Sequence, residues 1–464
     1  MAQQSSSAES AQSEFRRRQA RSVANTLRGS AGNLVEWYDV YAYSVFAVYF
    51  EKQFFSPEDQ NSQLYIWAIF AVTFLMRPLG SWLFGRFADR RGRKVALSVS
   101  ISLMAACSLG IALTPAESVL GIGSALLLVG FRLVQGLATG GEYGTSATYM
   151  SEAALPGKRG FFSSFQYVTL VGGHVLAQLT LLVMITTLPA DAITSWGWRV
   201  AFAIGGVGAL VVLWLRTSMD ESLSPETIAA NRSGAPTSAG SLRELLGRFP
   251  GAFILCFLVT MGGTLAFYAY SVNGPKMIQA GFADGNAVTG TLINLAALVC
   301  LMVLQPLGGL ISDRIGRKPL LIFFGVGAVC YTWVLYTVLP QARDPFVAFS
   351  VLLGGFVILT GYTSINAVVK AELFPTRVRA LGVGVGYALA NSVFGGTAPL
   401  LYSGALQAQQ VPLFVGYVTV ITAASLLVYI FGLRNNGVNW LDDPEAMERR
   451  RAERNREPVP VAAD

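Results

Sequence analysis

The sequence predicts an all-α polytopic membrane protein with twelve transmembrane helices. Of its 464 residues, 53% are hydrophobic and only 13% are charged, about half the charged share of a soluble protein. Apolar runs of about 20 residues, long enough to cross the hydrocarbon core as helices, follow one another along the chain. The basic residues stand in short clusters between these runs. That pattern is typical of membrane topology and differs from the basic face of a nucleic-acid-binding protein.

Each predicted span is an apolar run bounded by polar or turn-forming residues. Twelve runs meet the length requirement of a membrane-crossing helix. Because their number is even, both termini lie on the same side of the membrane. The predicted spans cover residues 28–50, 62–85, 95–114, 119–147, 161–188, 198–216, 250–273, 287–311, 319–339, 346–369, 379–404 and 412–433.

A polar segment rich in Ser, Gly and Pro divides the spans six and six. It predicts a linker at residues 217–248 between two helical bundles, at 28–216 and 249–433. The tails at 1–27 and 434–464 are polar, and no cleavable signal follows the basic run in the first. The expected order is therefore tail, six-helix bundle, linker, six-helix bundle, tail.

The distribution of basic residues predicts the orientation. Of the 34 Lys and Arg residues, three lie within or at the edge of spans, and 28 lie on the side of the two tails. The opposite side holds three, Lys52, Lys276 and Arg343. Because positively charged loops stay in the cytoplasm, we expect both termini to be cytoplasmic.

A loop motif occurs twice. Residues 85–94, after the second span, and residues 309–318, after the eighth, are identical at six of ten positions. A second pair of echoes follows the fourth and tenth spans, where residues 152–159 match 372–379 at Glu and Arg. Two motifs repeated at nearly the same offset indicate duplicated six-helix halves, as in many secondary transporters.

The charged residues of these repeats are predicted to form a gate. Glycines permit a tight turn, an aspartate can receive a helix N-terminus or an arginine, and arginines can hold neighbouring helix ends. Ion pairs of this kind must break when the halves rock. The alternative is that the basic residues only enforce topology. The predicted gate residues are Asp89, Arg90, Arg93, Asp313, Arg314, Arg317, Glu152, Arg159, Glu372 and Arg379.

The repeated loop resembles that of the major facilitator superfamily. Within it, four further segments resemble the metabolite:proton symporter family: residues 32–39, 77–80, 132–136 and 196–199. Residues 140–152 and 370–384 resemble the alpha-ketoglutarate permease branch of that family. One departure is His174, where that branch is expected to have glutamine. The resemblance covers about residues 25–435 and implies proton-coupled import of a dicarboxylate, 2-oxoglutarate foremost, across a bacterial inner membrane.

Charged residues at membrane depth are costly and are therefore candidates for substrate binding. Arg132 lies midway along the fourth span, with Gln135 on its helical face, and Arg77 lies in the second span. Two guanidinium groups suit a substrate with two carboxylates. The alternative is that each arginine only pairs with a buried acid. Polar residues of other spans complete the predicted substrate site: Tyr38, Gln166, Tyr268 and Asn391.

Three acidic residues are candidates for proton coupling. Glu36 and Asp39 share a face of the first span, and Glu142 lies in the fourth span with Arg132. Apolar surroundings favour the neutral form of a carboxyl group, as loading a proton requires. The alternative is a permanent salt bridge with a neighbouring arginine. The lone histidine, His174, is a weaker candidate, because such residues more often only form hydrogen bonds.

The sequence has no nucleotide-binding phosphate loop, metal-ligand cluster or nucleophile–base pair. We therefore expect no enzyme activity and no cofactor, with a proton gradient as the energy source. The expected partners are a small organic acid, protons and the lipid bilayer, with no nucleic acid and no obligate protein partner. Two alternatives stay open. In the first, the same fold carries citrate, a shikimate-like acid or proline/betaine. In the second, the chain is a nutrient sensor that transports nothing.

Overall fold

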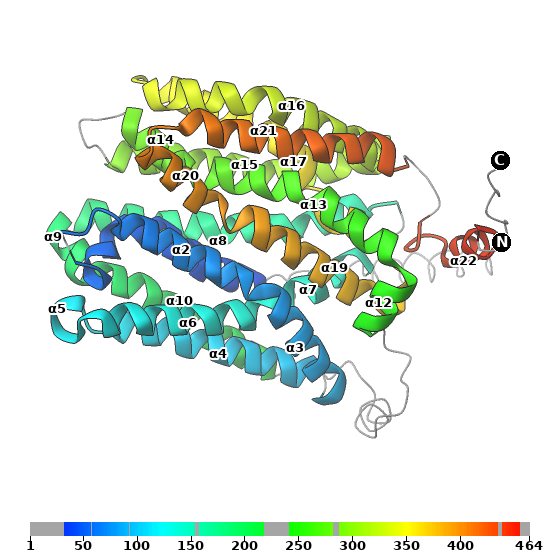
Figure 1. Ribbon diagram of the computed structural model, residues 1–464, viewed down its shortest axis with the longest axis horizontal. Coiled ribbons are helices and arrows are strands. Elements are labelled where there is room, and N and C mark those ends of the chain that lie inside the picture. The colour runs from blue at the N-terminus through cyan, green and yellow to red at the C-terminus, as the bar shows by residue number, and fades with distance from the viewer. Residues whose placement is uncertain are drawn as a thin grey trace, which may run out of the picture.

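The computed structural model describes residues 32–56, 58–91, 93–152, 154, 157–217, 241–281, 287–434 and 439–454. The predicted tail at 1–27 and most of the predicted linker lie outside these residues. The described part contains helices and turns and no strand. Its long helices run side by side along the longest axis of the molecule (Figure 1).

The first half of the chain begins with a helix over residues 32–54 and continues through a series of helices and short connections. These are α2 (Ser62–Leu75), α3 (Arg77–Arg91), α4 (Arg93–Leu113), α5 (Glu117–Leu120), α6 (Ile122–Gly140), α7 (Glu142–Glu152), α8 (Arg159–Thr187), α9 (Ala190–Ala192), the π-helical turn η1 (Ile193–Gly197) and α10 (Trp198–Thr217).

The second half repeats this pattern. Its elements are α12 (Leu242–Arg248), α13 (Pro250–Ser271), α14 (Gly274–Gly281), α15 (Ala287–Ile315), α16 (Arg317–Val338), the 3-10 turn η2 (Leu339–Gln341), α17 (Pro345–Thr363), α18 (Asn366–Ala371), α19 (Thr376–Ala390), the π-helical turn η3 (Asn391–Gly395), α20 (Ala398–Gln407), α21 (Val411–Leu427), the π-helical turn η4 (Val428–Gly432) and α22 (Pro444–Arg454).

Helix lies where each of the twelve spans is predicted, although several spans are broken. The second consists of α2 and α3, and the fourth of α6 and α7, which meet at Gly141. The fourth begins three residues later than predicted, at Ile122, because Gly121 adopts a positive φ of 56° and ends α5. Ten of the described helical segments are long and apolar enough to cross a membrane. The two remaining predicted spans, which α19–α20 and the helix over 32–54 fill, carry an interruption or several charges.

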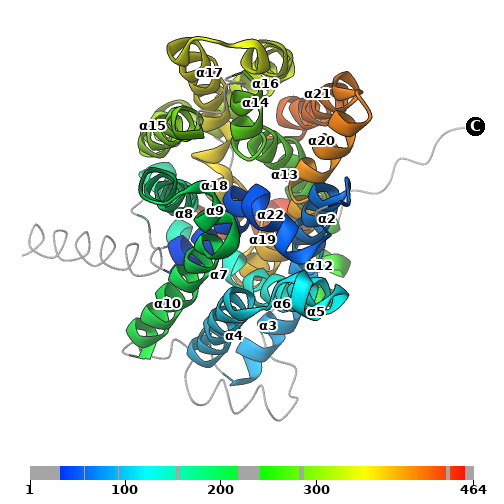
Figure 2. The ribbon, with the colours of Figure 1, turned by 90° about the vertical axis from the view of Figure 1, so that its left-hand side faces the viewer.

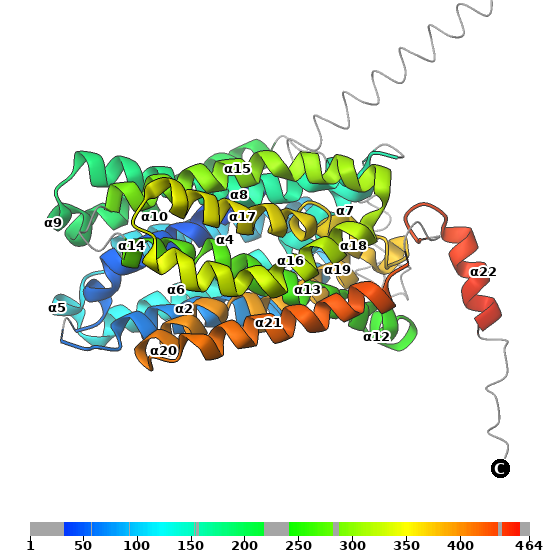
Figure 3. The ribbon, with the colours of Figure 1, turned by 90° about the horizontal axis from the view of Figure 1, so that it is seen from above.

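The two halves lie against each other along their length. In Figure 1, α4 and α6 of the first half lie on one side of the molecule, and α16 and α21 of the second lie on the other. Seen from the end (Figure 2) and from above (Figure 3), α8 lies beside α15 on one flank and α2 beside α20 on the other. The surfaces of the halves that face each other therefore enclose the centre of the protein.

Glycines let the central helices approach closely, as their four-residue spacing predicts. A Cβ on Gly136 would overlap the carbonyl oxygen of Thr73, and one on Gly140 would overlap that of Arg77. A Cβ on Gly144 would lie 2.6 Å from the Cα of Gly384, in the other half. The first two contacts pack α6 onto α2 and α3, and the third brings the halves together.

The outer surface is apolar, as a lipid solvent requires. Large side chains such as Leu113, Trp214 and Phe431 are more than 70% exposed. In a water-soluble protein so many exposed apolar side chains would be a liability. The charged residues of the spans instead point inward, and these define the candidate site.

Candidate functional site

A buried ion pair lies inside the first half. The Asp39 carboxylate, on the helix over 32–54, is 3.6 Å from Nη1 of Arg132 on α6. Gln135 joins the two, accepting from Arg132 at 2.9 Å and donating to Asp39 at 2.9 Å. Ser108 on α4 donates a further hydrogen bond to the carboxylate. The predicted shared face of Arg132 and Gln135 is therefore present, and the predicted alternative of a salt bridge is realised for Asp39 and Arg132.

Arg77 has a different environment. It begins α3, where α2 ends and the span is broken. Its guanidinium carbon lies 3.9 Å from the centroid of the Phe74 ring and 5.0 Å from that of the Trp37 ring, but Nε and Nη2 have no hydrogen-bond partner among the described residues. The side chain is 3% exposed. A buried guanidinium with unused donors is ready to receive an anion.

Five buried tyrosines gather where the two halves meet, three from the first half and two from the second. We call Tyr41, Tyr143, Tyr167, Tyr268 and Tyr387 the tyrosine cluster. The rings of Tyr143 and Tyr387 stack at a centroid distance of 3.5 Å, which joins α7 of the first half to α19 of the second. Arg77 adjoins the cluster through Phe74, whose ring lies under the guanidinium and packs edge-on against Tyr268 at a centroid distance of 5.4 Å.

Lys370 on α18 borders the same cluster and is not among the residues predicted to bind the substrate. It is completely buried, and its Nζ donates to the Tyr143 hydroxyl at 2.9 Å. Nζ also lies 4.1 Å from the centroid of the Tyr387 ring. Asn366, one helical turn earlier, donates to the hydroxyls of Tyr143 and Tyr167. In the sequence, Lys370 lies directly beyond the predicted end of the tenth span. It is therefore one of the basic residues that predict the topology.

The other predicted substrate residues divide between two places. Tyr268 belongs to the tyrosine cluster, and Asn391 lies near it at the start of η3, where its amide oxygen accepts from Thr264. Tyr38 donates to the carbonyl of Ala201 on α10 at 3.0 Å, away from the cluster. The side-chain amide of Gln166 forms hydrogen bonds with groups of its own half.

Gln166 and Asn33 hold three helices of the first half together. Gln166 donates to the Asn33 side chain at 3.3 Å and accepts from Ser146 at 3.0 Å. Asn33 in turn accepts from the indole of Trp37 and donates to Thr169. These bonds orient Trp37, which lies under Arg77. Gln166 therefore supports the arginine through its neighbours.

The remaining titratable candidates are all buried. Glu36 is 3% exposed and interacts electrostatically with Tyr268, which places it at the edge of the tyrosine cluster. Glu142 is 6% exposed at the N-terminus of α7. The ring of His174 stacks on Tyr41 at a centroid distance of 4.0 Å. Proton coupling by any of these residues stays a prediction.

The predicted gate residues gather at the end of the bundle that carries α12 and α22, which we call the gate end (Figure 1). The Asp313 carboxylate accepts from the backbone amides of Gly160 and Phe161 at 2.7 and 2.9 Å, and from Arg317 at 2.9 Å. Asp313 lies on α15 of the second half, and its carboxylate reaches across to the N-terminus of α8 in the first half. The loop motif predicts this contact between an aspartate and a helix N-terminus. Arg317 also pairs with Glu372 at 3.2 Å. Burial raises the pKa of Glu372, and the Arg317 guanidinium opposes this shift.

Two more ion pairs close the gate end. Glu152 on α7 pairs with Arg379 on α19, again linking the halves. Arg159, at the start of α8, pairs with Asp442, which precedes α22. The backbone carbonyl of Trp440 accepts a hydrogen bond from Arg379 at 3.0 Å. The Trp440 indole is buried near the Phe249 ring. The segment around Trp440 and Asp442 belongs to the predicted C-terminal tail, and no sequence pattern there indicates that it completes the gate.

The first copy of the loop motif is only partly visible. The side chains of Asp89, Arg90 and Arg93 lie outside the described residues. Arg314, in the second copy, is exposed. Its position fits the alternative in which some basic residues only set topology.

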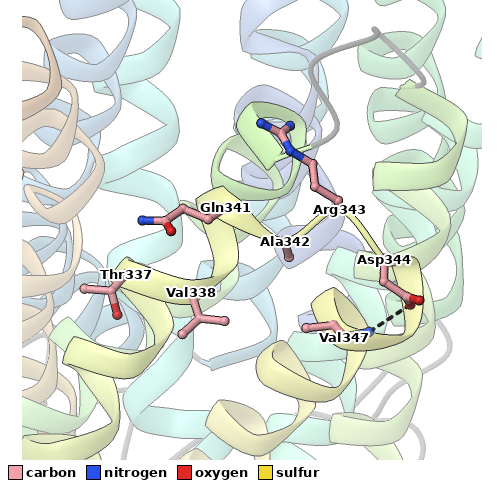
Figure 4. A pocket seen from close by; sticks show the side chains of 7 residues that line it. All are labelled: Thr337, Val338, Gln341, Ala342, Arg343, Asp344 and Val347. Carbon is pink, nitrogen blue, oxygen red and sulfur yellow. Dashed lines mark hydrogen bonds between the residues drawn. The ribbon is translucent and has the colours of Figure 1, made fainter.

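The halves also touch at the opposite end of the bundle. Lys276 on α14 lies 3.9 Å from the centroid of the Trp67 ring on α2, and Gln407 on α20 donates to the carbonyl of Gln60. A surface hollow occurs here at the loop between α16 and α17 (Figure 4). Asp344 caps α17 beside it, and none of the predicted site residues lines it. The halves thus touch at both ends around the buried arginines, lysine and tyrosines.

Comparison with known proteins agrees with this arrangement. The Sugar (and other) transporter family matches residues 26–226 and again residues 225–438. Alpha-ketoglutarate permease of Escherichia coli (strain K12) is 43% identical over 401 residues, which cover 86% of this chain and 91% of that protein. The citrate-proton symporter of Salmonella typhi is 31% identical over 377 residues, covering 81% and 85%. The structure of the proton:xylose symporter XylE bound to 6-bromo-6-deoxy-D-glucose, 19% identical, superimposes with a TM-score of 0.73, covering 92% and 99%.

A bundle of membrane-crossing helices with charges buried between two halves defines a multi-pass membrane transporter, and the relatives are transporters, not enzymes. The chain belongs to the Sugar (and other) transporter family of the major facilitator superfamily. The expected fold class is therefore confirmed.

Proposed function

We propose that this transporter is a proton-coupled symporter that imports a dicarboxylate, foremost 2-oxoglutarate. The observation that carries the proposal is Arg77, a buried guanidinium with two donor nitrogens that bond to none of the described residues. Desolvating a carboxylate without a partner is prohibitive, so an anion carrier needs such a group. The 43% identity to an alpha-ketoglutarate permease, against 31% to a citrate-proton symporter, favours the smaller acid.

Asp39 and Arg132 suit proton coupling better than substrate binding. The pair is enclosed within the first half by Gln135 and Ser108. When Asp39 takes up a proton, Arg132 loses its counter-charge and its side chain can change position. Protonation of the buried pair can therefore change how the helix over 32–54 packs against α6. We assign Asp39 as the proton carrier, with Glu36 and Glu142 as the alternatives.

Alternating access follows from the contacts at the two ends. The bundles predicted at residues 28–216 and 249–433 would rock about the tyrosine cluster, opening one end while the other stays shut. Opening the gate end must break the Glu152–Arg379 pair and remove Asp313 from α8. We place the chain in a bacterial inner membrane with both termini, and so the gate end, in the cytoplasm.

Uptake into proteoliposomes tests the proposal. The purified protein is reconstituted, and radiolabelled 2-oxoglutarate is added outside under an imposed pH gradient, alkaline inside. We expect accumulation above equilibrium that a protonophore abolishes and that excess unlabelled 2-oxoglutarate competes away. Excess citrate or proline serves as the comparison. If citrate or proline competes and is itself accumulated while 2-oxoglutarate is not, the assigned substrate is wrong. Binding without accumulation of any of them would favour a sensor.

A further inference from the structure

Lys370 is a buried cation that the proposed mechanism has not used. Its side chain is completely buried, and no carboxylate lies within 4 Å of Nζ among the described residues. Its one hydrogen bond among the described residues, to the Tyr143 hydroxyl, uses one of the three donors of an ammonium group. The other contacts are with the faces of the Tyr143 and Tyr387 rings. A charge held by a hydroxyl and two rings is incompletely compensated.

Arg77 and Lys370 reach the tyrosine cluster from opposite halves. Nζ of Lys370 lies 4.1 Å from the centroid of the Tyr387 ring. The Arg77 guanidinium lies 3.9 Å from the centroid of the Phe74 ring, which packs edge-on against Tyr268 at a centroid distance of 5.4 Å. Arg77 belongs to α3 of the first half and Lys370 to α18 of the second. Both are cations without an acidic partner in the described structure, since Arg77 forms no ion pair there either. The tyrosine cluster thus has one free positive charge on each side.

A purely structural role explains Lys370 less well. If the side chain only fastened α18 to the tyrosine stack, an apolar side chain of similar length would do so without the cost of burying a charge. Lys276 shows the contrast. It also lies over an aromatic ring, Trp67, but it interacts electrostatically with a carboxylate, Glu51. Among the residues that the structure describes, no such group pairs with Lys370. Its neighbour Asn366 donates two hydrogen bonds to hydroxyls of the cluster.

We propose that Lys370 binds one carboxylate of the substrate while Arg77 binds the other, so that the dianion bridges the two halves. The inference rests on the proposed dicarboxylate substrate and names its second ligand. The carboxylate takes the place of the Tyr143 hydroxyl at Nζ, and the hydroxyls of the cluster donate to the remaining oxygens. Specificity follows from the number of negative charges on the ligand. A dianion neutralises both cations as the halves close, whereas a monoanion leaves one of them buried and unpaired.

The test compares two ligands of equal chain length. 2-Oxoglutarate and 2-oxopentanoate differ in the distal carboxylate, and their dissociation constants are measured by calorimetry on purified protein. We expect the parent to bind 2-oxoglutarate at least ~30-fold more tightly, the discrimination that one charged contact supplies. Lys370→Gln should weaken 2-oxoglutarate binding by a similar factor and leave 2-oxopentanoate within about threefold, so that discrimination is lost. Lys370→Arg, which keeps the charge, should restore part of it.

Controls separate the possible failures. Lys276→Gln removes a lysine that lies over a ring outside the cluster and should keep the parent's discrimination. If Lys370→Gln does not fold, Lys370→Met, which fills nearly the same volume, replaces it. A folded Lys370 variant without the charge that still discriminates between the ligands overturns the inference and leaves the proposed function standing. A parent protein that binds no dicarboxylate overturns both.

Discussion

The Asp39 carboxylate and the Arg132 guanidinium face each other across 3.6 Å in the interior of the first half, each side chain at most 3% exposed. Such a pair contributes little net stability, because desolvating both charges offsets their attraction. Its presence at this depth therefore points to a use in transport. The two residues come from different helices, so a change in their charge acts on how those helices pack.

Replacing Asp39 with asparagine should separate substrate movement from proton coupling. The amide keeps contacts to Ser108 and Gln135 but can no longer take up a proton. We expect exchange of labelled for unlabelled substrate to persist while accumulation driven by a pH gradient is lost. Asp39→Glu should retain accumulation. Because Arg132 is left without its counter-charge, the asparagine variant should also be less stable, by up to about 3–5 kcal/mol.

Ser108→Ala is the matched control for this experiment, since it removes a hydrogen bond to the carboxylate and leaves the carboxylate itself. It should keep gradient-driven accumulation. Full accumulation by the Asp39→Asn variant would rule out Asp39 as the proton carrier and move attention to Glu36 and Glu142.

The gate end offers a second prediction. Glu152→Gln weakens the pair with Arg379, whose side chain is only 3% exposed, and so should favour opening of that end. Cys256 is a native probe, because it is completely buried beside Gly386 when the gate end is closed. In a variant in which the other three cysteines are replaced by serine, we expect Glu152→Gln to accelerate alkylation of Cys256 by a maleimide severalfold.

Glu244 provides the comparison for that measurement. It pairs with Arg377 at 2.8 Å, but both residues belong to the second half, so this pair need not break when the halves separate. Glu244→Gln should leave the alkylation rate close to that of the parent. An unchanged rate in the Glu152 variant would show that its ion pair does not hold the gate shut.

The charge asymmetry of the loops leads to a third prediction. With 28 of 34 basic residues on one side, reporter fusions after residues 240 and 440 should both report the cytoplasm. A periplasmic alkaline phosphatase and a cytoplasmic fluorescent protein make a complementary pair of reporters. Periplasmic activity at either position would contradict the twelve-span topology.

The sequence was sufficient to predict the fold because length and apolarity alone determine a membrane-crossing helix. It also predicted contacts that depend only on spacing within one helix, such as Arg132 with Gln135, and the docking of Asp313 on a helix N-terminus. The sequence does not determine which acid pairs with which arginine. Asp39 and Arg132 meet because of how two helices are rotated about their axes, and tertiary packing decides that rotation.

Lys370 was missed for a related reason. Hydropathy ends the tenth predicted span at residue 369, so the lysine was counted among the cytoplasmic charges. The structure buries it because α18, a separate helix after the break following Thr363, packs against α7 and α8 of the first half. A window average of hydropathy does not detect packing of this kind.

The last prediction decides which arginine meets the substrate. Arg77 has unused donors, whereas Arg132 is held by Asp39 and Gln135. Arg77→Gln should therefore cost roughly 2–5 kcal/mol of 2-oxoglutarate binding, most of it from the unpaired carboxylate. Arg77→Lys should weaken binding less, because it keeps the charge and loses the planar fork. Arg132→Lys, which can still pair with Asp39, should leave the dissociation constant near the parent's and alter the pH dependence of uptake instead. All variants are checked for folding by size-exclusion chromatography in detergent. If Arg132→Lys weakens binding as much as Arg77→Lys does, both arginines contact the dianion, and the coupling role assigned to the Asp39–Arg132 pair has to be shared with substrate recognition.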